Sequence, residues 1–222
     1  TTGTLSVLVP TAAMGGYQYR CVISDTVSPA IASAPATLTV RWSRFAALSA
    51  RGPVGTGEQT LILGFVYASG GKPTLVRGVG PGLFMSVRGY LRDPQLRLFA
   101  SDGAEVSRND DWAGTPALAE AFARTGAGPL ATTSKDSALV EALTGNLYTA
   151  HVTGAAGTTG VALAEVYDAD LTDKTKRLSA LSVRSQVGAG ESLLIAGFVL
   201  AGDAPRQVIF RAVGPGLANA VT

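Results

Sequence analysis

Two loops carry side chains whose types and spacing could bind a metal ion. Asp110 and Asp111 follow Asn109 and precede Trp112, and Asp136 belongs to a later loop. Carboxylate and amide oxygens are ligands that Ca²⁺ prefers, so Asp110, Asp111 and Asp136 are calcium candidates if their loops meet. The alternating spacing of an EF-hand loop is missing, however. The same residues would also suit a turn that caps backbone groups, with Trp112 closing the edge of a core.

A second acidic group, Asp168, Asp170 and Asp173, lies between the two halves of the chain. Carboxylates in a linker can bind calcium and stiffen a junction between domains. Basic residues follow directly, beginning with Lys174, and this mixture of charges favours a solvated linker instead. Apart from calcium, the sequence suggests no cofactor.

Two arginines, Arg77 and Arg211, occupy matching positions inside apolar, strand-like segments. Such an arginine could clamp a ligand. More often it forms a structural ion pair with a carboxylate, and Glu165, within another apolar strand, is the partner that we expect for Arg77.

Residues that perform catalysis are scarce. His151 is the only histidine and Cys21 the only cysteine, so a catalytic triad or a zinc site lacks partners. His151 alternates to the outer face of its strand, and Cys21 is expected to be buried or to pair with a cysteine outside this sequence. The glycines of residues 52–57 and 78–82 lack the context of a phosphate-binding loop and are interpreted as turns. We therefore predict no catalytic or cofactor-binding residues, and a protein that is not an enzyme.

Composition points to a β-protein. The 222 residues are 46% hydrophobic and only 15% charged, and they include 27 glycines. Many short strands joined by glycine-rich turns produce such a composition. The net charge is only +2, and the basic residues are scattered along the chain, which argues against nucleic acid as a partner. No apolar run reaches membrane-spanning length, which argues against membrane insertion.

These elements are organised around an internal repeat. Residues 44–83 recur as residues 177–217, with one residue inserted in the turn of the second copy. A repeat of this length indicates a tandem array of domains. The clearest identities are those of Leu48, Ser49, Arg51, Gly55, Glu58, Gly64 and Phe65 with Leu181, Ser182, Arg184, Gly188, Glu191, Gly197 and Phe198.

The first copy and the residues after it predict an antiparallel β-sandwich with one short helix. Residues 59–68 and 73–79 flank a Gly-Gly-Lys turn and predict a hairpin. Thr115 and Pro116 are typical of a helix start, with the helix over 117–124 ending at Gly126. Residues 137–143 are helical or extended. The remaining predicted strands are residues 94–100, 104–108, 147–152 and 161–167. We expect a jelly-roll-like sandwich.

The first 41 residues predict strands at 4–9, 17–24 and 36–40. Tyr19 lies two residues before Cys21, which is the spacing of the tyrosine corner on strand F of immunoglobulin sandwiches. The segment resembles the last three strands of an immunoglobulin-like domain, and that resemblance implies that earlier strands precede it in a longer protein.

A second resemblance rests on the ordered motifs at residues 93–112, 135–143, 145–154 and 160–168. Together with the repeated segment, they resemble a tandem β-sandwich repeat of large bacterial secreted and cell-surface proteins. The middle is also similar to bacterial pre-peptidase C-terminal domains. This resemblance implies an extracellular or cell-surface location and a role in adhesion, spacing or accessory binding.

The expected organisation is the end of an immunoglobulin-like domain (residues 1–41), a complete β-sandwich repeat (44–170) and the N-terminal part of a second repeat (177–222). Half a sandwich cannot bury its own inner face. The second copy therefore belongs to a longer array, packs on the first repeat, or completes a neighbouring chain by strand addition.

The resulting hypothesis is a non-enzymatic structural or adhesive segment of a large extracellular bacterial protein, with fibre formation through other copies of itself or neighbouring domains. The alternative is a carbohydrate- or matrix-binding accessory module of an exported enzyme, with calcium and a glycan or matrix ligand.

Overall fold

The computed structural model describes residues 4–8, 10–24 and 26–217. It is an all-β fold with one α-helix among these residues, α1 (Pro116–Thr125). The chain forms two compact units. One contains residues up to Ser43 together with Gly202–Gln207, and the other contains Arg44–Ala201 and the segment from Val208 onward.

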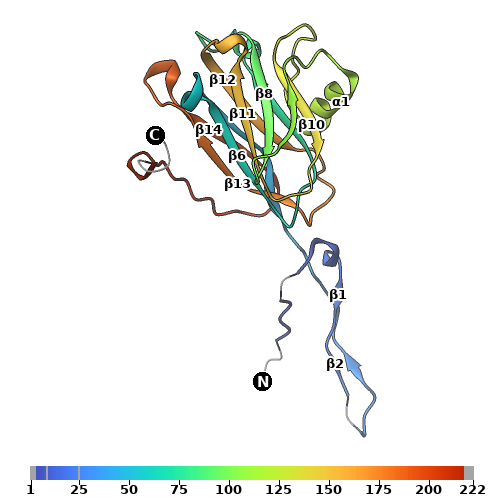
Figure 1. The fold of residues 1–222 in the computed structure, drawn as a ribbon. Coiled ribbons are helices and arrows are strands. Elements are labelled where there is room, and N and C mark those ends of the chain that lie inside the picture. Colours follow the sequence, from blue (N-terminus) through green and yellow to red (C-terminus); the bar gives the residue numbers. More distant parts are fainter. Residues whose placement is uncertain (1–3, 9, 25, 218–222) are drawn as a thin grey trace. The chain divides into compact units, whose positions relative to one another are not determined.

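The first unit is a narrow antiparallel ribbon (Figure 1). Two-residue strands pair in it, β1 (Gln18–Tyr19) with β4 (Ala36–Thr37) and β2 (Val22–Ile23) with β3 (Ile31–Ala32). The predicted strand over residues 4–9 is wrong for residues 4–8, which form no strand, and Val9 lies outside the described residues.

Cys21 is exposed, contrary to the expected burial. In the described part of this unit, the paired strands expose Val22, Ile23 and Ile31. A ribbon of paired two-residue strands has no second layer to cover a side chain, so alternation along the strand does not bury one face.

The base of the ribbon is joined to the returning chain by backbone hydrogen bonds. The amides of Asp203 and Ala204 both donate to the Trp42 carbonyl, at 2.9 and 3.1 Å. The Arg41 guanidinium pairs with the Asp203 carboxylate at 3.3 Å. The side chain of Arg206 also donates to the Ser43 carbonyl at 2.9 Å.

The second unit is an antiparallel β-sandwich, as predicted. Its strands are β5 (Ser43–Val54), β6 (Leu61–Ala68), β7 (Pro73–Val79), β8 (Pro94–Ala100), β9 (Glu105–Asn109), β10 (Ser137–Ala142), β11 (Leu147–Gly154), β12 (Gly160–Asp168), β13 (Arg177–Arg184) and β14 (Ile195–Gly202). They follow the order β10-β7-β12-β5-β13-β6-β11-β8-β9, and β14 also pairs with β5. Because β5 and β13 pair only at Phe45 and Leu178, the sheet divides there into two layers, β10-β7-β12-β5-β14 and β13-β6-β11-β8-β9.

Alternation along the strands builds the core between these layers. Leu61, Leu63 and Phe65 of β6 are fully buried, and Leu96 and Leu98 of β8 lie in the same cluster. A smaller core forms on the outer side of β7, where Leu75 packs with Trp112 and Phe122. Figure 1 shows α1, which carries Phe122, beside β10 on this outer side.

The predicted hairpin of β6 and β7 is wrong. The segment after β6 turns at Ser69 and Gly70, which both have positive φ, and carries the chain from one layer to the other. There, β7 pairs with β10 and β12 instead of β6. The reason is burial on both faces, since Val76 belongs to the main core and Leu75 to the outer one.

Other local predictions are confirmed. The predicted strands at residues 94–100 and 104–108 are present as β8 and β9, which pair as a hairpin. Helix α1 begins after Thr115 and ends at Gly126, which adopts the left-handed conformation with φ 73°. The ambiguous segment from Ser137 is the strand β10, because β7 offers it a complete pairing edge.

The two copies of the repeat exchange strands. In the second copy, β13 is the counterpart of β5 and β14 the counterpart of β6. Strand β13 pairs with β6, with Leu181 opposite Phe65, and β14 pairs with β5. Each copy therefore places its first strand against the second strand of the other copy.

Candidate functional site at the junction of the two copies

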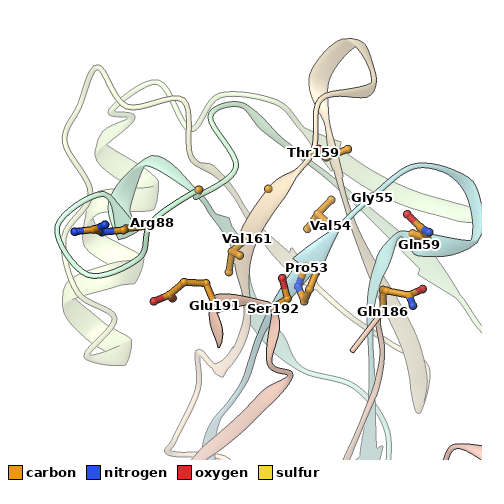
Figure 2. Close-up of a pocket in the computed structure, with 12 residues that line it drawn as sticks. Pro53, Val54, Gly55, Gln59, Arg88, Thr159, Val161, Gln186, Glu191 and Ser192 are labelled. Atoms are coloured by element: carbon orange, nitrogen blue, oxygen red, sulfur yellow. The ribbon is translucent and has the colours of Figure 1, made fainter. Parts of the chain in front are cut away.

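A pocket of about 380 Å³ lies where the turns after β5 and β13 approach each other. Figure 2 shows side chains from both copies around it. Its lining consists of Pro53, Val54, Gly55, Gln59, Arg88, Gly89, Thr159, Gly160, Val161, Gln186, Glu191 and Ser192.

The chemistry of this lining is limited. Arg88 and Glu191 are its charged residues, and it contains no aromatic, histidine, cysteine or aspartate side chain. Acid–base catalysis needs titratable groups placed around a reacting atom, and the titratable side chains of this lining are Arg88 and Glu191. With the amides of Gln59 and Gln186 and the hydroxyl of Ser192, the arrangement can hydrogen-bond a polar group.

The charges at the junction follow the exchange of strands. Arg184 of β13 lies 3.2 Å from Glu58, which precedes β6. The counterparts Arg51 and Glu191 lie 4.0 Å apart. The repeated Arg and Glu positions thus make two reciprocal contacts between the copies. Both are partly exposed, so each contributes at most about 1 kcal/mol.

The three calcium candidates have different surroundings. Asp136 is fully buried, and its carboxylate accepts hydrogen bonds from the amides of Gly80 (2.7 Å) and Gly82 (3.0 Å) and from the Ser134 hydroxyl. It therefore caps the turn that ends β7. Asp110 accepts a long bond of 3.4 Å from Gln95.

Asp111 faces a lysine. Its carboxylate lies 3.8 Å from Lys135 Nζ, which also contacts Asp93 at 2.8 Å. The hydrogen bond to Asp93, followed by the charge of Asp111, raises the pKa of Lys135. Within the described residues, no group of three or more His, Cys, Asp or Glu side chains could hold a metal ion. Calcium binding stays a prediction.

The acidic linker is more ordered than expected. Asp168 is buried and pairs with buried Lys72 at 3.0 Å, and burial raises the pKa of its carboxyl group. Lys72 Nζ also donates to the Asp173 carbonyl at 2.9 Å. The expected solvated linker is therefore wrong at Asp168, because the linker folds back over the start of β7.

The two later linker carboxylates are turn residues. Asp170 accepts hydrogen bonds from the hydroxyl and amide of Thr172, and Asp173 does the same with Thr175. The bonds from Thr172 lower the pKa of Asp170. The bonds from Thr175 lower the pKa of Asp173 to about 2.

The predicted pair of Arg77 and Glu165 is confirmed. Arg77 Nε donates to Glu165 Oε2 at 2.7 Å, and its Nη1 donates to the Gly128 carbonyl at 2.6 Å. The guanidinium lies over the rings of Phe122 and Tyr167, at 4.9 and 5.6 Å. The guanidinium is thus engaged by a carboxylate, a carbonyl and two rings of the protein, which favours a structural role.

His151 lies on the outer face of β11, as predicted, and its ring centroid is 4.6 Å from that of Phe99. Partial burial, followed by the charges of Arg97 and Arg184, lowers its pKa. The charged groups that affect its pKa are both arginines, whereas a histidine that acts as a catalytic base is oriented by a carboxylate.

The sequence interpretation missed the buried lysine and the small residues of the exchange. Lys72 was assigned to a turn, where burial is not expected. Gly64 faces Ser182 across β6 and β13, and Gly197 faces Ser49 across β14 and β5. All four residues are preserved between the copies, and that pairing of a glycine with a serine was the available signal.

No family model matches the chain, and no curated protein shows significant similarity to it. The resemblance to bacterial surface repeats therefore stays a prediction. No helix in the described ranges has the length and apolar character needed to cross a membrane.

Proposed function

We propose that this protein is a non-enzymatic structural or adhesive segment of a large extracellular bacterial protein, in which β-sandwich repeats are locked together by exchanged strands. The observation that supports the proposal is the reciprocal pairing of β13 with β6 and of β14 with β5. Two copies joined in this way cannot separate without breaking two strand pairs, which suits a segment that must transmit force or maintain spacing.

Packing reinforces the pairing. Leu178 of β13 is fully buried in the main core, and Phe45 of β5 meets Phe198 of β14 edge to face, with ring centroids 5.4 Å apart. Because the strand pairs and the contact between the Phe45 and Phe198 rings are lost together when the copies separate, the resistance is cooperative.

The alternative of a glycan-binding module needs exposed aromatic rings around a binding surface. Trp112, one of the two tryptophans, is buried against Phe122 with ring centroids 5.2 Å apart. The lining of the pocket adds no aromatic ring. These positions favour the structural role.

Two experiments test this proposal. Antibodies raised against the chain should label intact cells that produce it, and labelling only after lysis would contradict an extracellular role. If the role is structural, the purified chain should also show no saturable binding on glycan and matrix-protein arrays, with calcium and with a chelator. A reproducible glycan signal would support the accessory-module alternative instead.

A further inference from the structure

The second copy presents an apolar face that the first copy keeps buried. Ile209, Phe210 and Val213 are 87%, 70% and 48% exposed, whereas their counterparts Leu75, Val76 and Val79 are 0%, 0% and 3% exposed. In β14, Phe198 is 39% exposed, and its counterpart Phe65 is fully buried. Exposed apolar surface of this kind marks an interaction site, and Phe198 and Phe210 lie together on it with ring centroids 5.7 Å apart. We call the surface formed by β14 and residues 208–217 the open face.

The first copy shows what covers each of these positions. Leu75 is covered by Trp112 and Phe122, which come from the α1 region. Phe65 stacks on Tyr148 of β11 with centroids 5.7 Å apart. Strand β7 is flanked on both edges, by β10 and β12. These covering groups belong to residues 84–168, the part that follows the repeated segment in the first copy.

Polar groups on the open face lack the same partners. Arg211 is exposed, and among the described residues none forms an ion pair with it, whereas its counterpart Arg77 is buried with Glu165 of β12. The turn at Gly80 is capped by Asp136 and is so close to the Leu91 carbonyl that a Cβ would clash. At the counterpart Gly214, a Cβ would meet nothing within 4 Å.

Backbone pairing is missing as well. Residues 207–213 form no strand (Figure 1), although the matching residues of β7 do. Strand β13 has β6 on one edge and touches β5 at one position only, whereas β5 has β12 along its length. Since β13 corresponds to β5, β14 to β6 and residues 207–213 to β7, the pairing of the first copy predicts which strands would pair with the second. A β12-like strand would lie between β13 and residues 207–213, and a β11-like strand would lie beside β14.

We propose that the open face binds a segment equivalent to Phe84–Asp168 of a further repeat, joined after the second copy as that segment is joined after the first. This segment would supply β10-, β11- and β12-like strands, an aspartate cap for Gly214 and a glutamate for Arg211. The two sheet layers would then each continue across both copies. The inference rests on the proposed structural role, since it describes how repeats of such an array interlock.

A second copy of the whole chain is a poorer occupant. Its own residues 84–168 are already engaged by its own β5, β6 and β7, and releasing them would expose the main core. Only an uncommitted segment of the same kind can pair with the open face without that loss.

The test is a chain extended in its natural register. Thr222 matches Arg88 in the alignment of the copies, so the full chain is followed directly by a second copy of Gly89–Lys176. Hydrogen exchange of residues 195–213 is measured in the original and the extended chain. We expect exchange there to slow by about tenfold or more in the extended chain, which should remain monomeric.

Charge exchange makes the test specific. Arg211→Glu should abolish the added protection in the extended chain. In that variant, Glu165→Arg made only in the appended copy of residues 89–176 should restore the protection. Arg20→Glu, the same charge change at an exposed position of the ribbon, is the matched control and should leave protection unchanged.

Two outcomes would overturn the proposal. In one, exchange of residues 207–213 is the same in both chains. In the other, the original chain protects these residues only as its concentration rises, which would identify self-association as the role of the open face. Both outcomes are read from backbone pairing alone, so they are distinct from a failure of the proposed structural role, which is read from cell labelling and array binding.

Discussion

The two copies of the repeat place nearly the same residues in opposite environments. Leu75 and Arg77 of the first copy are buried between strands, while Ile209 and Arg211 of the second are exposed. The first two strands of each copy pair in the same way, since each copy supplies one strand to each sheet layer. Their burial already differs in the second strand, where Phe65 of β6 is buried and Phe198 of β14 is 39% exposed. Burial at a position in this fold is therefore decided by the neighbouring strands, not by the residue that occupies it.

The largest expected difference in stability between the two copies comes from replacing the matched arginines. Arg77→Met should lower the free energy of unfolding by about 3–5 kcal/mol, because it leaves the buried Glu165 carboxylate without a cation and with only the hydrogen bond from the Tyr167 hydroxyl. Arg211→Met should change it by less than about 0.5 kcal/mol. Urea unfolding followed by circular dichroism measures both. The double change Arg77→Met with Glu165→Leu should recover much of the loss, and equal effects of the two single changes would contradict the contrast.

Truncating the matched apolar residues should give a somewhat smaller effect. Leu75→Ala creates a cavity beside Trp112 and Phe122 and should cost about 2–5 kcal/mol. Ile209→Ala, at an exposed position, should change stability by less than about 0.5 kcal/mol. The same unfolding experiment applies. In the extended chain described above, Ile209→Ala should become costly, and a persistently neutral effect there would argue against coverage of the open face.

The exchange of strands can be tested by enlarging the glycines that face a serine across the exchanged strand pairs. A Cβ at position 64 would collide with the Ser182 hydroxyl, and one at position 197 would lie 2.9 Å from the Ser49 hydroxyl. Gly64→Ala and Gly197→Ala should each cost about 1–3 kcal/mol.

Rescue identifies the partners in this test. Ser182→Gly should restore the Gly64→Ala variant but not the Gly197→Ala variant, and Ser49→Gly should do the reverse. The opposite result, in which Ser49→Gly restores Gly64→Ala or Ser182→Gly restores Gly197→Ala, would show that each copy forms its own strand pair instead.

The smallest expected effect is a dependence on pH. His151 faces Arg97 of β8 and Arg184 of β13, and its pKa in the folded state lies below the ordinary value of 6.5. Because the unfolded chain then binds more protons, stability should fall as the pH drops below about 6.5 and level off above it. His151→Gln should flatten this part of the profile, as measured by urea unfolding between pH 5 and 8. An unchanged slope would assign the dependence to other groups.

Several features could be predicted from residues alone because their causes are local. Thr115, Pro116 and Gly126 define the ends of α1, since capping and backbone freedom act within one turn. The alternation in β8 and β11 identified the buried faces and placed His151 outward. The pair of Arg77 and Glu165 was predictable because an arginine among apolar strand residues requires a carboxylate.

Tertiary structure decided the rest. The Gly-Gly-Lys turn is compatible with a hairpin, and only the competing edges of β10 and β12 draw β7 into the other layer. In the sequence, Asp168 is typical of a solvated linker residue. In the structure, the linker folds over Lys72, and Asp168 is buried in an ion pair with it. The repeat indicates two copies of one unit, but sequence similarity carries no information about which copy a strand pairs with. Identical strands offer identical hydrogen-bonding edges, so the choice between pairing within a copy and exchange between copies depends on the connecting segments and on the core that they close.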